Sequence, residues 1–479
     1  MKNIALAVLM AGTANAAVVT YPAPPEISPS PYYQVTVNGK PVFVYPVNVP
    51  TIADAQGKLL PNRHVIFKNS PAAMCSFDTS GSARITVTVL DGAPQGALES
   101  VVVRPLRHGI KPKLKGNTLT FSVKGPVQLS IEPNGSILAP LFIFANPMEK
   151  NPPKPDAPGV RYLGPGVHDI GKIQVPSDST LYLAGGAYVY GQLNSENVTN
   201  VTVRGRGILN GSRGDADRHV RWFKSKDIRM EGITLVDCRS WGIKLLHCDD
   251  VTIQNVKIIN PAADAIDACS SDNVTVDGVF ARTHDDTFNV KGLTDALGHG
   301  YPADANKKWS PEGYRRSARN IKYLNSVVWN DRAHALMIGP ETRATEITDI
   351  LFKDIDVIHA VSVDVIGIFS SDAAPISNVR YENIRIEDAR VQTLVELRVH
   401  HAYTTADSTM GVISNVVFRN VSITTPTPLY SAICADSNTV TGVHFEKFIY
   451  NGVVATNPAS MYLHIRGDAR DITFPKPKK

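Results

Sequence analysis

The sequence predicts an all-β protein in which a right-handed parallel β-helix follows an N-terminal antiparallel β-sandwich. A short phrase of alternating apolar and polar residues recurs from about residue 198 onward. Residues 30 to 150 lack that phrase and instead show alternating strands separated by Gly, Asn and Asp turns. A chain of 479 residues is also too long for one ordinary core, which favours two modules.

The recurring phrase sets the length of the repeat unit. Each copy opens with Asn, Asp or Gly, continues with a β-branched residue and ends in a second apolar run, as in "DDVTIQNVKIIN". The anchor residues are Val201, Ile228, Val251, Val274, Ile321, Ile350, Val379, Val416 and Val443. Their first steps of 27, 23 and 23 residues are too short for a strand, a packed helix and another strand. They fit single coils of a parallel β-helix, and the longer steps predict inserted loops.

The N-terminal residues resemble a secretory signal in composition. A lysine, a short apolar run and Ala14-Asn15-Ala16 predict cleavage after Ala16. We therefore expect a secreted or periplasmic protein with a signal peptide over 1–16, a β-sandwich domain and linker over 17–154, and the β-helix domain over 155–479. The proline-rich "MEKNPPKPDAPG" marks the boundary between the two domains. No later apolar stretch is long enough to predict a membrane span.

Charge and cysteine content exclude several classes of partner. Lys and Arg number 49 against 44 Asp and Glu, an excess of +5 that is too small and dispersed to predict nucleic-acid binding. The five cysteines show no metal-ligand spacing, so we expect no metal and no cofactor. They are interpreted as buried small hydrophobic residues, with a Cys248–Cys269 disulfide as the alternative.

Stacking of the coils predicts which distant residues become neighbours. Equivalent positions of successive coils lie about 4.8 Å apart in a parallel solenoid. Aligning "SWGIKL", "ADAIDA", "DDTFNV" and "AHALMI" gives a first column of Trp241, Asp264, Asp286 and His334, which Asp364 continues. A second column contains Lys244, Asp267 and Asn289, and Asp285 lies beside the first.

Two pairs of adjacent aspartates call for different interpretations. The pair Asp249 and Asp250 directly precedes the anchor Val251, where a turn with solvated side chains is expected. Asp285 and Asp286 are expected in a strand interior, where repulsion and low strand propensity require another explanation. The alternative is a structural role, in which stacked Asp and Asn side chains form a polar ladder that only satisfies backbone donors.

Three carboxylates converging on one face suit the hydrolysis of a glycosidic bond. One carboxyl group must stay protonated to donate to the leaving oxygen, and an ionised one must activate water. Crowded negative charges raise the pKa of one member, so the arrangement generates its own acid. Carboxylates in separate columns also leave room for a water, as in inverting enzymes.

The blocks "NPAADAID", "THDDTFNVKG" and "AHALMIG" resemble the active-site blocks of the pectinase-like β-helix glycoside hydrolases. That clan contains the polygalacturonases of family 28 and the dextranases and isopullulanases of family 49. The resemblance covers about residues 155 to 450, and the sandwich is similar to the extra domain of the dextranase-like branch. It implies an inverting hydrolase of α-glycosidic bonds in a polysaccharide or oligosaccharide. It also implies Asp285 as general acid, Asp264 and Asp286 as the residues that hold and deprotonate water, and His334 beside the acid.

The chain departs from the clan at two points that bear on the substrate. Polygalacturonases follow the histidine with an Arg-Ile-Lys that binds galacturonate, whereas the corresponding coil here reads "VDVIGIFSSD". The first block also has Ala where the clan usually has Asn-Thr. Arg398 and Arg343 are candidate replacements for the missing cations, or else ordinary rim arginines. The full set of candidate substrate-binding residues is Trp241, Lys244, Asp267, Asn289, Lys291, Asp364 and Arg398.

Several alternatives stay open at the level of sequence. Trp241 could stack on a sugar ring or belong to the core. Lys244 and Lys291 could bind substrate or simply be solvated. A polysaccharide lyase on the same fold would recruit Lys291 or Asp267 but leave the carboxylate triad without a purpose. A carbohydrate-binding solenoid without activity is the remaining possibility.

Overall fold

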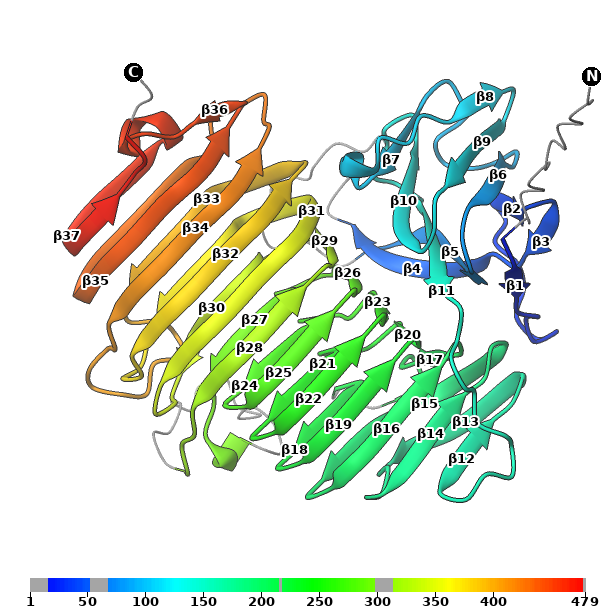
Figure 1. The fold of residues 1–479 in the computed structure, drawn as a ribbon, viewed down its shortest axis with the longest axis horizontal. Coiled ribbons are helices and arrows are strands. Elements are labelled where there is room, and N and C mark those ends of the chain that lie inside the picture. Colours follow the sequence, from blue (N-terminus) through cyan, green and yellow to red (C-terminus); the bar gives the residue numbers. More distant parts are fainter. Residues whose placement is uncertain (1–15, 52–67, 215–217, 298–312, 477–479) are drawn as a thin grey trace, which may run out of the picture.

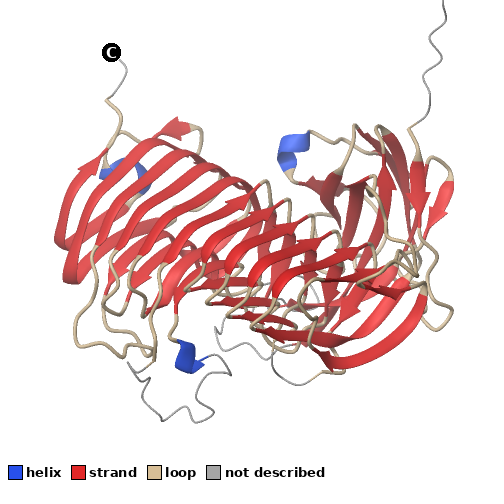
Figure 2. Cartoon of the chain, turned by 60° about the horizontal axis from the view of Figure 1, so that its bottom comes forward, coloured by secondary structure: helices blue, strands red, loops and turns tan. Residues whose placement is uncertain are grey.

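The computed structural model describes residues 16–51, 68–214, 218–297 and 313–476, and it is all-β with two parts (Figure 1). A sandwich lies beside the early coils of a long parallel β-helix, and both parts consist almost entirely of strands (Figure 2). The predicted fold class is therefore confirmed. The expected signal peptide lies outside the described residues except for Ala16, and no helix in the described ranges is long and apolar enough to cross a membrane.

Two facing sheets make up the sandwich. Its strands alternate buried and exposed side chains, as in β6, because one face of each sheet packs on the other. One sheet consists of β1 (Val18–Thr20), β4 (Tyr45–Thr51), β5 (Lys68–Thr79), β7 (Val101–Arg104), β10 (Val127–Pro133) and β11 (Leu141–Pro147). The other consists of β2 (Tyr33–Val37), β3 (Lys40–Val42), β6 (Ala83–Val89), β8 (Lys113–Lys115) and β9 (Thr118–Val123), with the 3-10 helix η1 (Leu106–His108) between β7 and β8.

The β-helix is built from three parallel stacks of strands. The first stack contains β12 (Val160–Leu163), β14 (Ser179–Leu183), β16 (Thr199–Gly205), β19 (Lys226–Glu231), β22 (Asp249–Gln254), β25 (Asp272–Asp277) and β28 (Ala318–Leu324). The second contains β17 (Ile208–Asn210), β20 (Thr234–Val236), β23 (Lys257–Ile259), β26 (Phe280–Thr283) and β29 (Val327–Asn330). The third contains β18 (Val220–Phe223), β21 (Ile243–Leu246), β24 (Ile266–Cys269), β27 (Phe288–Gly292) and β30 (His334–Thr342).

Longer strands bend from one stack into the next at both ends of the β-helix. These are β13 (Gly166–Ile173), β15 (Ala187–Glu196), β31 (Ile347–Ser370), β32 (Ile376–Ile386), β33 (Ala389–Val399), β34 (Ile413–Ile423), β35 (Tyr430–Tyr450) and β37 (Leu463–Thr473). The short β36 (Val453–Val454) pairs antiparallel with β35. Two further 3-10 helices are η2 (Asp295–Leu297) and η3 (Pro458–Met461). The insertions predicted in the long repeat steps lie after β27 and after β33.

The predicted repeat register is confirmed from coil to coil. Every anchor pairs with the next one, for example Val251 with Val274 and Val274 with Ile321, and their side chains fill the interior. The residue before each anchor has a left-handed conformation and is Asn or Asp, such as Asp250 at φ 55° and Asn273 at φ 58°, except before Val443, where it is Gly442. Asn273 Nδ2 donates to Asp250 Oδ1 at 3.0 Å, so this corner forms a ladder. Asp249 and Asp250, the aspartate pair for which a turn was expected, therefore lie at a partly exposed corner of the coil.

The sandwich packs on the outer face of the second stack. Apolar residues of β4, β5 and β11 form one cluster with residues of β17, β20, β23, β26 and β29. A buried ion pair also joins the two parts, since Arg206 Nε donates to Asp78 Oδ1 at 2.8 Å. All five cysteines are free and buried, so the alternative Cys248–Cys269 disulfide is wrong.

Candidate active site

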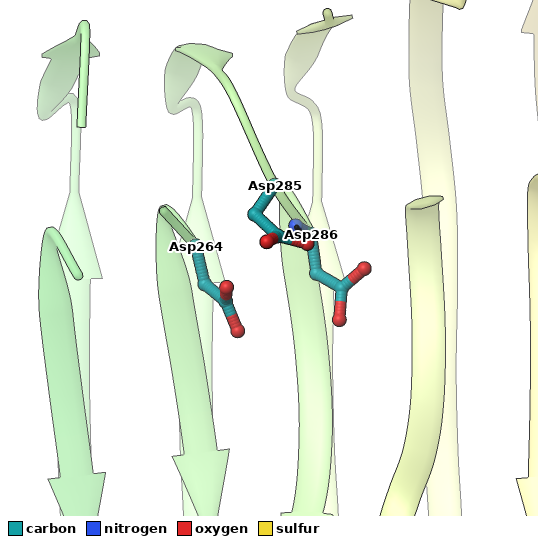
Figure 3. A group of neighbouring side chains, drawn as sticks. All are labelled: Asp264, Asp285 and Asp286. Carbon is teal, nitrogen blue, oxygen red and sulfur yellow. Dashed lines mark hydrogen bonds between the residues drawn. The ribbon is translucent and has the colours of Figure 1, made fainter. Parts of the chain in front are cut away.

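The three aspartates lie where the coils turn from the second stack into the third. Asp264 stands just before β24, and Asp285 and Asp286 occupy the bend between β26 and β27. The expectation that the pair sits inside a strand is thus wrong, because the chain changes direction there. Figure 3 shows the three side chains side by side. One carboxylate oxygen from each lies within 4.8 Å of the others.

The coil register brings the predicted first column together. Ile266 pairs with Phe288 and Phe288 with Leu336, so Asp264, Asp286 and His334, each two residues earlier, follow one another. His334 pairs directly with Asp364. The second column is also as predicted, because Lys244 pairs with Asp267 and Asp267 with Asn289.

Asp286 is held by an imidazole and an amide. His334 Nδ1 lies 2.6 Å from Asp286 Oδ1, and Asn289 Nδ2 donates to Oδ2 at 2.7 Å. Burial favours the neutral carboxyl group, but the charge and hydrogen bonds of His334 hold the pKa of Asp286 below its ordinary value. Burial disfavours the imidazolium, yet Asp286 and Asp364 raise the pKa of His334 to about 10. The pair is therefore an ionised carboxylate and an imidazolium at neutral pH, and the histidine bonds to Asp286 rather than to the expected acid Asp285.

Asp264 is neutralised by a single ammonium group. Lys291 Nζ donates to Asp264 Oδ2 at 2.8 Å and lies 3.5 Å from both Asp267 Oδ1 and Glu341 Oε2. Burial raises the pKa of Asp264, and Lys291 offsets only part of this effect. Burial and the charge of Asp264 raise the pKa of Asp267 well above its ordinary value, so Asp267 stays protonated. Asp264 is thus a more basic carboxylate than Asp286.

Asp285 is the member that keeps its proton. Burial, followed by the charges of Asp264 and Asp286, raises the pKa of Asp285 to about 7. Its backbone is fixed because Asn330 Nδ2 donates to the Asp285 carbonyl oxygen at 2.6 Å. The three neighbouring carboxylates therefore differ in proton affinity, as the pairing of an acid with a base requires.

Four of the predicted substrate-binding residues are buried beside the three aspartates. Lys244, Asp267 and Asn289 have no exposed surface, and the Trp241 side chain is 7% exposed. The Trp241 ring packs with Phe223, Leu246, Cys269 and Leu293, and Lys291 Nζ lies 4.5 Å from its centroid. Lys244, Asp267 and Asn289 therefore have no surface for direct contact with a substrate. Asn289 instead donates to Asp286, and the Lys291 ammonium lies against the Trp241 ring.

The arginines considered as replacements for the missing cations bind groups of the protein. Arg343 is fully buried, and its Nη1 donates to the Thr404 carbonyl oxygen at 2.6 Å. Arg398 Nη2 bonds to Glu396, which lies two residues away on the same face of β33. Asp364 is buried, with Oδ2 3.4 Å from His334 Nε2. The buried Arg343 and Asp364 are therefore not placed to bind a sugar carboxylate, whereas the Arg398 side chain is 34% exposed and stays a candidate.

Two residues near the site escaped the sequence interpretation. Glu341 approaches Lys291 from β30, beyond the aligned histidine block. Arg332 is partly buried two residues before His334. Its positive charge offsets a small part of the rise in the pKa of Asp285, and burial followed by this charge lowers the pKa of His284. Their charge and their position close to the aspartate-rich block could have marked both residues as candidates. The direction in which each side chain points, however, depends on how the loops fold.

The site can perform acid–base chemistry without further groups. Asp285 supplies a proton, while Asp264 and Asp286 present negative oxygens to a polar reactant on the same side (Figure 3). Three clustered carboxylates could also hold a divalent cation. Lys291 and the His334 imidazolium already offset much of the negative charge, which weakens the attraction for such an ion.

Comparisons with known proteins agree with this chemistry. The family model "Glycosyl hydrolases family 28" matches residues 186–452. An exopolygalacturonase from Zea mays is 21% identical over 232 residues, which are 45% of this chain and 49% of that protein, so the match spans about half the length of that curated relative.

Solved structures are also similar to this chain. Dex49A from Penicillium minioluteum has a TM-score of 0.57 and 16% identity, covering 95% of this chain and 96% of that one, so both domains share its fold. The family 28 exopolygalacturonase of Yersinia enterocolitica gives a TM-score of 0.49 with 12% identity over 81% of this chain and 96% of that one. The family model covers more than half of the chain and includes all four catalytic candidates. This protein belongs to family 28 of the glycosyl hydrolases.

Proposed function

We propose that this glycoside hydrolase cleaves α-glycosidic bonds in a polysaccharide or oligosaccharide by inversion at the anomeric carbon. The observation that carries the proposal is the clustering of three carboxylates with different proton affinities within 4.8 Å. Asp285 donates a proton to the glycosidic oxygen as the bond to the anomeric carbon breaks. Its raised pKa keeps that proton in place until the leaving group accepts it.

A water held by Asp264 and Asp286 is the proposed nucleophile. Two oxygens less than 4.8 Å apart can both accept hydrogen bonds from one water about 2.8 Å from each. Asp286 orients the water, because His334 and Asn289 fix both of its oxygens. Asp264 takes the proton, because its pKa is raised and it is therefore the stronger base. The hydroxyl group adds to the face opposite the departing oxygen, which inverts the configuration.

The spacing of the carboxylates needs a separate argument. Inverting pairs are typically separated by roughly 6.5–9.5 Å and retaining pairs by roughly 5–5.5 Å. The nearest oxygens here are closer than either range. Retention requires a carboxylate that can form a covalent bond to the sugar. Asp286 is held at both oxygens and Asp264 is held through Oδ2 by Lys291, which favours water as the nucleophile.

The lyase alternative is not favoured by the same contacts. A lyase needs a basic group free to remove a proton next to a uronate carboxyl group. Lys291 pairs with the Asp264 carboxylate and lies 3.5 Å from Glu341, and the protonated Asp267 is fully buried. Neither group is placed to act as that base. The chain lacks the Arg-Ile-Lys motif that binds galacturonate in polygalacturonases, so the substrate class is not decided by this motif. The proposal therefore includes both polygalacturonase-like and dextranase-like substrates. We also propose export, on the strength of the signal-like residues 1–16.

A substrate screen with anomer analysis tests the proposal. Purified protein is incubated with pectic, dextran-like and other α-linked glycans, and the first-formed reducing end is followed by proton NMR. We expect hydrolysis of at least one α-linked glycan with the β-anomer formed first. An initial α-anomer would refute inversion. A product that absorbs in the ultraviolet because of a new double bond would instead indicate a lyase.

The pH dependence of kcat/KM should identify the acid and the base. Because Asp285 must be protonated and its pKa is raised to about 7, kcat/KM should fall about tenfold per pH unit above pH 7. The acidic limb should lie above the ordinary aspartate value of 3.8, since Asp264 must be ionised and its pKa is raised. A basic limb near pH 10 would point to His334 instead.

A further inference from the structure

A cleft of about 720 Å³ lies between the sandwich and the corner where the second stack turns into the third. The sandwich contributes Tyr32, Asn48 and Pro71 to its lining, and the β-helix contributes Tyr190, Asp237 and Ala262. These segments meet where β4 approaches the ends of β17, β20 and β23 (Figure 1). Clefts at domain interfaces are common ligand sites, and this one is large enough for several sugar rings.

The floor of the cleft is a connected set of polar side chains. Asn210 Nδ2 donates to Asp237 Oδ2 at 3.3 Å and to the Tyr188 hydroxyl at 2.8 Å, and Asn260 Nδ2 donates to Asp237 Oδ1 at 3.1 Å. Asn48 of the sandwich also hydrogen-bonds to Asp237. The amides and the carboxylate are therefore fixed in place, while their remaining donors and acceptors suit the hydroxyl groups of a sugar.

Tyrosine and proline side chains form the walls. Tyr190 is partly exposed, and the Arg213 guanidinium lies 3.6 Å from its ring centroid, which holds the ring. Tyr32 and Pro71 belong to the opposite wall on the sandwich. Flat aromatic and proline surfaces pack against the apolar faces of pyranose rings, so the walls complement the polar floor.

The cleft is aligned with the catalytic carboxylates. Its lining comes from four successive coils, through Tyr190, Asn210, Asp237 and Asn260, which spans about 14 Å at the coil spacing. The last of these coils also carries Asp264, only two residues after the lining residue Ala262. The cleft and Asp264 therefore share one coil, and the cleft extends from that coil toward the N-terminal end of the β-helix.

We propose that the interdomain cleft is a distal subsite that binds hydroxyl-bearing pyranose units of the glycan chain cleaved at Asp285. The inference rests on the proposed function, and it assigns the sandwich a role in selecting long chains. Short substrates reach only the carboxylates, whereas longer ones gain contacts to Tyr190, Asn48 and the polar floor.

Binding of oligosaccharides of increasing length tests the inference. The full-length Asp285→Asn variant is titrated by calorimetry with oligogalacturonides and with isomalto-oligosaccharides of two to eight units. We expect one series to bind at least tenfold more tightly at eight units than at two. Adding Tyr190→Ala or Asn48→Ala should weaken binding of the eight-unit chain at least fivefold and leave the two-unit chain unchanged. Tyr162→Ala, on β12 outside the cleft, is the matched control and should change neither.

The possible outcomes separate the inference from the proposed function. Equal effects of Tyr190→Ala and Asn48→Ala on short and long chains, or no binding of any chain, would overturn the inference. Failure of the wild-type protein to hydrolyse either series would count against the proposed function, while the length-dependent binding would still be measurable. Asn48 is exposed on β4, so its variant decides the matter if Tyr190→Ala lowers the melting temperature.

Discussion

Replacing Asp285 with Asn should lower kcat about 10³-fold on a natural glycan, because the leaving oxygen loses its proton donor. Aryl glycosides with good leaving groups need less protonation and should lose much less activity. Substrate binding should persist in calorimetry, since Asn keeps the shape of the side chain. The matched control is Asp250→Asn, which alters the exposed aspartate pair at a coil corner and should leave kcat unchanged. Full activity of Asp285→Asn would remove this residue from the acid role.

The same substitution should make the folded protein more stable at alkaline pH. The folded-state pKa of Asp285 is about 7, against an ordinary value of 3.8. Ionisation in the folded state is therefore unfavourable, and the penalty grows as the pH rises from about 4 to 7. Asn removes it, so the free energy of unfolding should rise by about 4 kcal/mol at pH 8 and change little at pH 4. Thermal melting at the two pH values measures the difference, and a destabilised variant at pH 8 would contradict it.

Replacing Lys291 with Met should destabilise the protein by about 3–5 kcal/mol at pH 7, because the Asp264 carboxylate loses its ammonium partner, which also lies 3.5 Å from Glu341. The loss should shrink as the pH falls toward 4, because Asp264, whose pKa is raised in the folded state, takes up a proton and no longer leaves a buried charge. Activity should fall at least 10²-fold, since Asp264 no longer stays ionised to accept a proton. Urea unfolding followed by fluorescence, at pH 7 and pH 4, measures the stability.

Two further variants make this result specific. Lys226 pairs with Asp250 at 3.5 Å on the surface, so Lys226→Met should change stability by less than about 1 kcal/mol. Adding Glu341→Gln to Lys291→Met removes one of the uncompensated charges and should restore part of the lost stability. An undiminished loss in the double variant would show that the contact between the Lys291 ammonium and the Trp241 ring, rather than the ion pair with Glu341, holds this site together.

Periodicity made the β-helix and its active column predictable. Each anchor, such as Val251 or Val274, repeats a local pattern, and parallel pairing then stacks whatever follows it at a fixed distance. Asp264, Asp286 and His334 were therefore placed in one column without any knowledge of the tertiary fold. The alternating pattern did not predict the bend at Asp285 and Asp286. Two adjacent polar residues can belong either to a strand or to a corner between strands, and the sequence pattern is the same in both cases.

The repeating sequence by itself determined the coil register and the meeting of Asp264, Asp285 and Asp286. Only the tertiary structure decided which neighbours are exposed and which carboxyl group keeps its proton. Lys244, Asp267 and Asn289 point outward from the third stack, yet the loop after β27 and its Leu293 cover this region. Register follows from a local period, whereas burial and pKa depend on contacts between residues far apart in the chain.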